Sequence, residues 1–432
     1  MRFFGNIKSD NNKLSIAGVS AQVLAKEYGT PLYIMDEQLV RENCRRFYKS
    51  FKSEDGNNKV AYAGKAFLTI AMCEIIKSEG LYLDVVSGGE LYTASKAGYP
   101  LQNVYFHGNN KTADEIEMAV ELGVGSFVVD NLHEMEIINE KANEKGIVQR
   151  VLLRVTPGIE AHTHDYIKTG QIDSKFGFTI LNNELEEVIK TALSLKNIKF
   201  AGLHCHIGSQ IFELEPYRDA IRIMTSLIKD IKDKFNYDIE ELDLGGGFGV
   251  YYYEDDEPKE IEEFCTVIME EAKIKCDEYA INYPTLVIEP GRSIVANAGI
   301  TLYTVGAIKD IPEVRKYVAV DGGMTDNIRP ALYNAQYQCV LANKINGPCI
   351  EVVTIAGKCC ESGDILLEDV KLPKVNSGDL MAMLSTGAYG YSMCSNYNKI
   401  PKPPVVLVSE GTHKVICKRQ TYQEMISNEV CL

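Results

Sequence analysis

The sequence has no run of about 18 apolar residues, the length that a membrane-spanning helix requires. Its amino terminus turns polar within a few residues, so we expect neither a signal peptide nor a membrane span, and a cytoplasmic protein. No two of its 12 cysteines have C-x-x-C spacing. Without that spacing or a small disulfide framework, we expect reduced thiols rather than disulfides or a zinc knuckle.

Positive charge is also scarce in this chain. Its 432 residues include 45 Lys and Arg against 60 Asp and Glu, which gives a formal net charge of -15. Nucleic-acid binding needs clustered Lys and Arg to meet the phosphates, so the charge argues against a nucleic-acid partner. Hydrophobic residues make up 45% of the chain, and its length exceeds one ordinary core, so we expect two domains.

From residue 60 to residue 290, short apolar runs typical of β-strands alternate with segments of helical patterning. Eight such runs occur: Val60–Ala63, Leu81–Val86, Val104–His107, Ser126–Asp130, Arg150–Val155, Phe200–His206, Glu241–Leu244 and Thr285–Glu289. Helix signals lie between them, such as Thr112 with Glu115 in capping-box spacing and Gly123 at the helix end. Eight β/α units of this size predict a (β/α)8 barrel of the TIM type, and a doubly wound open sheet is the alternative.

The pattern changes on both sides of this region. Before it, Ser20 is placed to cap a helix, Ala21–Tyr28, which Gly29 closes. After it, alternating strands are expected at Tyr317–Val320, Ile350–Ile355, Leu380–Leu384, and in a hairpin of Val405–Ser409 with Thr412–Arg419. We therefore predict a barrel domain over residues 31–290, and a mostly antiparallel β domain made of residues 1–30 and 291–432.

Lys65 stands at the carboxyl end of the first run, and the carboxyl ends of its strands are where a (β/α)8 barrel has its active site. A desolvated lysine can lose its proton near neutral pH and attack a carbonyl group, as lysines that carry Schiff-base cofactors do. By itself, the position is more typical of a lysine that reaches solvent. The other strand ends decide the interpretation.

Two further strand ends suit a phosphorylated ring cofactor. The seventh run leads into Gly-Gly-Gly-Phe-Gly at residues 245–249, where backbone N–H groups can close around an anion. This run matches neither G-x-G-x-x-G nor the Walker pattern, so a nucleotide is not indicated. The eighth run ends in Glu289, followed by Arg292. With pyridoxal phosphate, Glu289 could hold the ring nitrogen protonated and Arg292 could bind a substrate carboxylate; the alternative is a local ion pair.

Four histidines offer a rival interpretation as a zinc site. His204 with His206, and His162 with His164, have the period-two spacing that puts each pair on one side of an extended chain, as a barrel metallohydrolase would need. We find no carboxylate or third histidine pair that completes the set. The Gly-Ser that follows His206 suits a ring lying beside a phosphate, so we predict no metal.

With these motifs, the sequence resembles the diaminopimelate decarboxylases, which belong to the barrel-fold (fold-type III) pyridoxal-phosphate decarboxylases and are related to alanine racemase. The resemblance covers nearly the whole chain and rests on seven segments, residues 62–66, 84–90, 206–210, 245–249, 289–293, 360–364 and 387–389. It implies an alanine racemase-like two-domain architecture and pyridoxal 5'-phosphate as cofactor. The lysine motif departs from the wider family at Phe67, where Asn is common.

Position by position, the resemblance makes Lys65 the Schiff-base lysine and stacks His206 on the cofactor ring. It implies that Glu289 faces the pyridine nitrogen. Around the phosphate it puts Ser209, Gly246, Gly247 and Tyr389. Cys360 and Glu361 would enter the active site of the opposite subunit, which implies a homodimer with shared sites.

The substrate is argued from Arg329, in a segment that resembles the diaminopimelate enzymes. Diaminopimelate has an amino acid centre at each end, so its distal carboxylate needs cationic donors. Arg292, Arg329 and Tyr333 could supply the donors, and Glu361 could accept from the distal ammonium. Tyr389 is expected at the substrate as well as at the phosphate. Ornithine lacks this carboxylate and would leave a buried arginine unpaired, which is costly.

The expected reaction is the decarboxylation of meso-2,6-diaminopimelate to L-lysine and carbon dioxide, the last step of lysine biosynthesis. Cys360 is the candidate that manages the proton replacing the carboxylate, because a thiol can tune its pKa near neutral. Two alternatives remain. One is a decarboxylase of the ornithine or arginine type with the same fold, and the other is a regulatory homologue that binds pyridoxal phosphate without catalysis.

Overall fold

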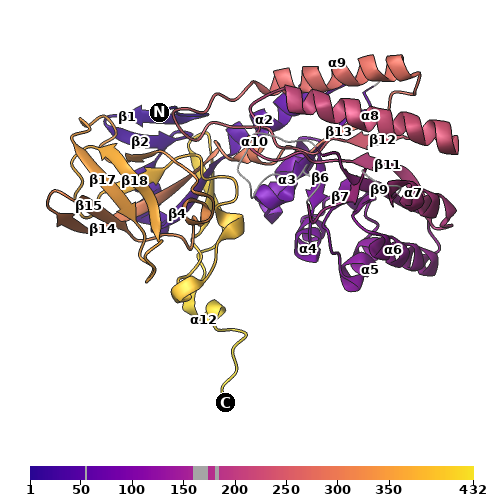
Figure 1. Cartoon of the computed structure of the whole chain (residues 1–432). Helices are drawn as coiled ribbons and strands as arrows, with labels where there is room; N and C mark the ends of the chain where they lie inside the picture. The colour runs from indigo at the N-terminus through magenta and orange to yellow at the C-terminus, as the bar shows by residue number, and fades with distance from the viewer. Residues whose placement is uncertain (54–55, 159–173, 181–183) are drawn as a thin grey trace. The chain divides into compact units, whose positions relative to one another are not determined.

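The computed structural model describes residues 1–53, 56–158, 174–180 and 184–432 (Figure 1). The chain forms two compact units. Unit 1 consists of residues 1–42, 250–256 and 294–432, and unit 2 consists of residues 43–249 and 257–293. Among the helices described, none is both long and apolar enough to cross a membrane.

Unit 2 is built on a closed parallel barrel. Its strands in chain order are β5 (Lys59–Ala63), β6 (Tyr82–Val85), β7 (Val104–Phe106), β8 (Ser126–Val129), β9 (Gln149–Thr156), β11 (Ile198–His204), β12 (Glu241–Asp243) and β13 (Thr285–Ile288). Each strand pairs with the next, and β13 returns to pair with β5, so the ring closes. This closure confirms the predicted (β/α)8 barrel and excludes the doubly wound open sheet. The short β10 (Phe178–Thr179) adds to β9 outside the ring.

Helical segments lie between successive barrel strands, with α2 before the first and α10 after the last, and the longer helices lie outside the ring (Figure 1). They are α2 (Glu37–Ser50), η1 (Gly64–Ala66), α3 (Ile70–Ser78), α4 (Gly88–Lys96), η2 (Leu101–Asn103), α5 (Ala113–Leu122), α6 (Leu132–Lys145), α7 (Glu184–Ser194), α8 (Glu215–Phe235), α9 (Ile261–Tyr279) and α10 (Arg292–Val295). At the start of α5, Glu115 N–H donates to Thr112 Oγ1 at 3.3 Å, and Thr112 N–H donates to Glu115 Oε2 at 3.0 Å. Gly123 ends α5 with φ 76°. The predicted capping box and stop are confirmed.

The two ends of the barrel interior differ in character. At the amino-terminal end, the buried Glu241 accepts from the Tyr105 hydroxyl at 2.9 Å and from Lys59, and Arg150 lies 3.3 Å away. These cations neutralise a carboxylate that would otherwise be costly to bury. Apolar side chains from neighbouring strands, such as Leu152, fill the layer next to it. At the opposite, carboxyl end of the strands, where (β/α)8 barrels have their active sites, polar groups are found instead.

Unit 1 contains a long mixed sheet in the order β18 (Ile365–Leu372), β17 (Glu351–Ala356), β15 (Arg315–Val320), β14 (Gly299–Ile311), β4 (Leu32–Asp36), β20 (Val405–Ser409) and β21 (Thr412–Cys417). Next to β14 lies β19 (Leu380–Met383), which pairs with β16 (Cys339–Leu341). The pairings are antiparallel except for β15 with β17 and β20 with β4. The predicted mostly antiparallel domain and its hairpin are confirmed.

The remaining elements of unit 1 are short. A separate three-stranded sheet contains β1 (Ile7–Asp10), β2 (Lys13–Ile16) and β3 (Val19–Ser20), and the helical elements are α1 (Ala21–Tyr28), α11 (Arg329–Tyr333), η4 (Tyr391–Met393), η5 (Tyr397–Lys399) and α12 (Tyr422–Met425). The helix predicted at α1 has the expected bounds, and Gly29 ends it with φ 69°. Ser20 is the N-cap residue by position, but its side chain makes no capping hydrogen bond, contrary to the prediction.

The two units differ from the predicted domain boundaries at three places. The predicted barrel domain, residues 31–290, includes residues 31–42 with β4, and residues 250–256, which all belong to unit 1, while residues 291–293 belong to unit 2. Four of the five residues of β4 are apolar and only Asp36 is charged, so its sequence suits either sheet. Long-range pairing with β14 and β20 decides its place.

Candidate active site

Lys65 projects from η1, the single turn that follows β5, and its side chain is exposed. Two features fix this turn. A Cβ on Gly64 would lie 2.8 Å from the backbone oxygen of Asp84, so only glycine fits. The Tyr62 hydroxyl donates to the Phe67 carbonyl at 2.6 Å, and Phe67 itself is buried. The exposed amine is therefore presented at the carboxyl end of the barrel, as predicted, but protein burial alone does not desolvate it.

Glu289 follows β13 and is buried against two imidazoles. Its Oε1 lies 2.7 Å from Nε2 of His107, and its Oε2 lies 3.4 Å from Nε2 of His204. Burial raises the pKa of Glu289, but the two imidazoles lower it, and the result lies well below the usual range. Glu289 is therefore an ionised carboxylate in a buried site, which suits it to face a protonated ring nitrogen.

His206 lies against the glycine run that follows β12. Gly246 N–H donates to Nδ1 of His206 at 3.2 Å. Burial, together with the positive charges of Lys65 and Arg154, lowers the pKa of His206 well below its usual value, so the ring is neutral. A Cβ on Gly245 would lie 2.6 Å from Nδ1 of His206. Absent side chains therefore allow the backbone to pack directly on the imidazole.

The rest of the glycine run is equally tight. A Cβ on Gly246 would lie 2.1 Å from the backbone oxygen of Glu289, and a Cβ on Gly247, whose φ is 102°, would lie 2.5 Å from that of Gly208. Arg292, which begins α10, is buried and donates from Nη2 to Ser209 Oγ at 3.0 Å. Unit 2 thus brings seven predicted site residues to the carboxyl end of the barrel: Lys65, His206, Ser209, Gly246, Gly247, Glu289 and Arg292.

The other five predicted site residues lie in unit 1, where three of them form one aromatic cluster. Arg329 is buried, and its Nε donates to the Tyr337 hydroxyl at 2.8 Å. Its guanidinium lies 5.4 Å from the ring centroid of Tyr333, 5.7 Å from that of Tyr389 and 5.9 Å from that of Tyr252. The sequence analysis missed Tyr252 and Tyr337, and no motif marks either position.

Cys360 and Glu361 lie on an exposed loop between β17 and β18. Asp364 holds the base of this loop. It is buried and accepts hydrogen bonds from Met324 N–H at 2.6 Å and from Cys359 N–H at 2.8 Å. Asp364 was part of a motif that carried the family resemblance, but its structural role was not foreseen. The two predicted residues therefore stand on a braced loop with their side chains in solvent.

The sequence analysis also missed buried groups beside Glu289. His107, Asp243 and His204 each offer an atom within 4.8 Å of one another and of Glu289. Their positions could have been recognised from the sequence, because His107 ends one predicted strand run and Asp243 lies in another. His204 had been considered only as a zinc ligand. The argument that no carboxylate completes a histidine set was wrong, since two lie beside His204. His162 and His164, the other pair of the zinc hypothesis, lie outside the described residues.

Comparison with known protein families identifies the family of this chain. A model described as "Pyridoxal-dependent decarboxylase, pyridoxal binding domain" matches residues 37–296. The chain belongs to the pyridoxal-dependent decarboxylase family. It is 50% identical to the diaminopimelate decarboxylase of Bacillus methanolicus over 100% of both chains. It is 49% identical to that of Bacillus subtilis over 97% of this chain and 95% of the relative.

Solved structures give the same result. The crystal structure of diaminopimelate decarboxylase from M. jannaschii has a TM-score of 0.93 and 36% identity, covering 99% of this chain and 98% of that chain. A second structure of the same enzyme, in complex with L-lysine, matches equally well. Both the architecture and the resemblance inferred from the sequence are thereby confirmed for this pyridoxal-dependent decarboxylase.

The groups at the carboxyl end of the barrel fit the cofactor of this family. Pyridoxal phosphate needs an amine for its aldehyde, backbone donors for its phosphate and an anion opposite its protonated ring nitrogen. Lys65 offers the amine, and the buried Glu289 carboxylate offers the anion. The glycine run lies at the same end of the barrel, where it packs so closely on the protein's own atoms that Gly245, Gly246 and Gly247 leave no room for a Cβ. This pyridoxal-dependent decarboxylase therefore has an amine and a buried anion that match the aldehyde and the ring nitrogen of the cofactor.

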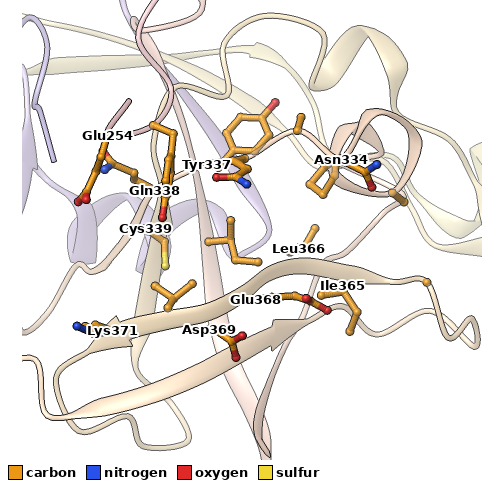
Figure 2. A pocket seen from close by; sticks show the side chains of 18 of the residues that line it. Glu254, Asn334, Tyr337, Gln338, Cys339, Ile365, Leu366, Glu368, Asp369 and Lys371 are labelled. Atoms are coloured by element: carbon orange, nitrogen blue, oxygen red, sulfur yellow. The ribbon is translucent and has the colours of Figure 1, made fainter. Parts of the chain in front are cut away.

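Unit 1 also contains a cavity of about 900 Å³ (Figure 2). Its walls come from residues 334–339 on one side and from β18 on the other, with Glu368 and Asp369 among the lining residues. None of the predicted site residues lines it. Tyr337, which accepts the hydrogen bond of Arg329, does line it, so the cavity lies next to the aromatic cluster of the decarboxylase without containing its arginine.

Proposed function

We propose that this chain decarboxylates meso-2,6-diaminopimelate to L-lysine and carbon dioxide with pyridoxal 5'-phosphate as cofactor, the last step of lysine biosynthesis. The relatives at 50% and 49% identity over nearly the full chain are named as diaminopimelate decarboxylases. The neighbouring crystal structure of that enzyme holds L-lysine, which is the product of this reaction.

The observation that carries the substrate is the environment of Arg329. Its guanidinium is buried among phenol rings, and no carboxylate of the described residues forms an ion pair with it. Burial lowers the pKa of Arg329, but the surrounding phenols raise it above its usual value, so it stays charged. A buried, charged guanidinium is stabilised by a planar anion that it can bind through two hydrogen bonds. The distal carboxylate of diaminopimelate is such an anion, and ornithine and arginine have none at that end.

Four parts of the chain would hold the cofactor. Lys65 would hold its aldehyde carbon, His206 would lie against its ring, and Glu289 would face its ring nitrogen. The phosphate would be bound by Ser209, Gly246, Gly247 and Tyr389. When bound, pyridoxal phosphate supplies the electron sink that accepts the pair left behind when carbon dioxide departs.

The protein's own groups then bind the substrate and control its protons. Arg329, Arg292 and Tyr333 bind and orient the substrate, and Glu361 accepts from its distal ammonium. Glu289 keeps a proton on the ring nitrogen, which maintains the electron sink. Cys360 delivers a proton to the carbon that has lost its carboxylate, so one proton replaces one carbon dioxide.

Cys360 and Glu361 are exposed on their loop, and we propose that they complete the site of a second copy of the chain. The protein then works as a homodimer with two shared sites. We further propose a cytoplasmic location, because all 12 cysteines are free, as is typical of a reducing compartment.

A carbon dioxide release assay on the holoenzyme tests the reaction. meso-Diaminopimelate, ornithine, arginine and lysine are offered separately at equal concentration. We expect release from meso-diaminopimelate only. Comparable carbon dioxide release from ornithine or arginine would refute the assignment of diaminopimelate as the substrate. Bound cofactor without carbon dioxide release from any of the four amino acids would mean that the protein is a homologue that binds pyridoxal phosphate without catalysis.

A further inference from the structure

Five buried ionisable side chains meet beneath the proposed cofactor site. They come from five different strands: Asp84 on β6, His107 after β7, His204 on β11, Asp243 on β12 and Glu289 after β13, and each is at most 6% exposed. His107 is central, because its Nε2 lies 2.7 Å from Glu289 Oε1 and 3.7 Å from Asp84 Oδ1. We call these five residues the buried cluster.

The two imidazoles contact both oxygens of the same carboxylate. His204 approaches Glu289 Oε2 with its Nε2, and its ring meets that of His107 edge to face, with centroids 4.9 Å apart. Burial lowers the pKa of His204 to about 3, so the ring is neutral and can approach the carboxylate with an N–H on Nε2. Glu289 thus has one imidazole nitrogen next to each oxygen: the contact with His204 is a hydrogen bond, and the contact with His107 is an ion-pair contact.

The other two carboxyl groups of the buried cluster have pKa values shifted in the opposite direction from that of Glu289. Burial raises the pKa of Asp84 and raises that of Asp243 well above its usual value, and the Glu289 carboxylate raises both further. Glu289 alone has its pKa lowered, by the two imidazoles. Of these three carboxyl groups, the one that would face the cofactor is therefore the one whose pKa the buried cluster lowers.

We propose that His107 and His204 are positioning residues that keep the Glu289 carboxylate ionised and oriented toward the ring nitrogen of the cofactor. The inference rests on the proposed cofactor site. Without the imidazoles, burial and the neighbouring carboxyl groups would favour a protonated Glu289, which cannot hold a proton on the ring. The other ionisable groups that act on the buried cluster include Lys65, Glu90, Tyr105, Arg154, Cys205, His206 and Glu241.

The test compares two cofactors that differ only at the ring nitrogen. Full-length protein stripped of cofactor is titrated with pyridoxal phosphate and with 1-deazapyridoxal phosphate, in which a carbon replaces that nitrogen, and Kd is measured from the absorbance of the bound ligand. We expect wild type to prefer pyridoxal phosphate by about tenfold or more, as a charge-assisted hydrogen bond gives. The preference should fall to near one in His107→Leu and survive in part in His107→Gln, whose amide can still donate.

Control variants separate positioning from folding. His133→Leu replaces an exposed histidine of α6 and should keep the wild-type preference. Glu289→Gln should abolish the preference, and adding His107→Leu to it should change nothing further. Far-ultraviolet circular dichroism establishes that each variant is folded.

Three results would overturn the inference. Equal weakening of both cofactors in His107→Leu would mean that His107 is only structural. A stoichiometric divalent metal in the stripped wild-type protein, lost in His107→Leu, would mean that a cation rather than the two imidazoles fixes Glu289. Failure of wild type to bind pyridoxal phosphate at all would remove the proposed function itself, and so differs from the first two results.

Discussion

At the scale of single residues, each side chain proposed to react or bind substrate is held in place by neighbouring residues that take no part in the reaction. Lys65 depends on Gly64, which alone tolerates the 2.8 Å approach to a backbone oxygen. Arg329 depends on the ring of tyrosines around it, and Cys360 on the buried Asp364 beneath its loop. Substitution of such a neighbour is expected to displace a reactive group without removing it. A small displacement of a reactive group lowers the rate of the catalysed reaction strongly.

Arg329→Gln should raise KM for meso-diaminopimelate by about 10- to 100-fold and change kcat less. The reason is that Arg329 is proposed to bind the distal carboxylate, which takes no part in bond breaking, so its contribution is to binding of ground and transition state alike. Steady-state kinetics of the holoenzyme measure this. Arg315→Gln, at a partly exposed arginine that pairs with Glu368, is the matched control. An unchanged KM in Arg329→Gln would refute the substrate assignment.

The buried His204 predicts a dependence of stability on pH. Its pKa falls from 6.5 in the unfolded chain to about 3 in the folded protein because it is buried. Between these values the unfolded state binds one proton more, so stability is full above pH 6.5 and is lost as pH falls, by about 1.4 kcal/mol per pH unit. His206, whose pKa is also lowered, adds to the same loss.

Urea denaturation between pH 6.5 and pH 5 measures this slope. His204→Leu should reduce it by about one proton, while the exposed His133→Leu should leave it as in wild type. The chosen interval lies above the range in which Glu289 takes up a proton in the unfolded chain. An identical slope in wild type and His204→Leu would show that His204 is not buried as a neutral ring.

At the scale of elements, strand ends and helix starts carry most of the information. Each barrel strand delivers a polar group at or next to its carboxyl end, and the connecting helices α3, α4, α5 and α6 begin at residues whose side chains cap them. Thr112 illustrates this, since it and Glu115 satisfy each other's backbone N–H groups at the start of α5.

Thr112→Ala should loosen the first turn of α5 by about 1 kcal/mol, which corresponds to roughly fivefold faster amide exchange there. Hydrogen–deuterium exchange with mass spectrometry resolves the peptide that covers this turn. Ser20→Ala is the control, because Ser20 precedes α1 without a side-chain capping bond and should change exchange in α1 little. Equal effects in both helices would show that the capping box contributes nothing.

At the scale of the whole molecule, the residues proposed for the reaction belong to both units. Unit 2 carries the residues proposed for the cofactor, and unit 1 carries the tyrosine-lined Arg329 and the exposed loop with Cys360. The proposed site residues are spread over both units, so no continuous segment of the sequence contains all of them. The proposed activity therefore requires both units, and the exposed position of Cys360 leads us to expect a contribution from a second chain.

Mixing two inactive variants tests the shared site. Lys65→Ala and Cys360→Ala are each expected to be nearly inactive, yet a mixed dimer contains one site with both residues intact, so mixing after subunit exchange should restore up to about one quarter of wild-type activity. Carbon dioxide release measures it. Lys65→Ala mixed with Lys65→Ala is the control. If the two different variants also restore nothing while subunit exchange is demonstrated, the site is not shared.

Much of the fold could be predicted because its signals are local. Each of the eight apolar runs became a barrel strand, since strand length, helix caps and glycine turns are encoded within a few neighbouring residues. The candidate site was predicted in part for the same reason: Lys65, Glu289 and the glycine run stand at strand ends that the pattern identifies. Ser20 shows the limit, because a suitable residue at the right position need not form the bond.

The sequence by itself determined the strand order, the barrel and the groups placed at its carboxyl end. Only the tertiary structure decided that β4 joins the sheet of unit 1, because four of its five residues are apolar and fit any apolar layer. It also decided that His107, His204 and Asp243 converge on Glu289. These residues are far apart in the chain, and closure of the barrel is what brings their strand ends together.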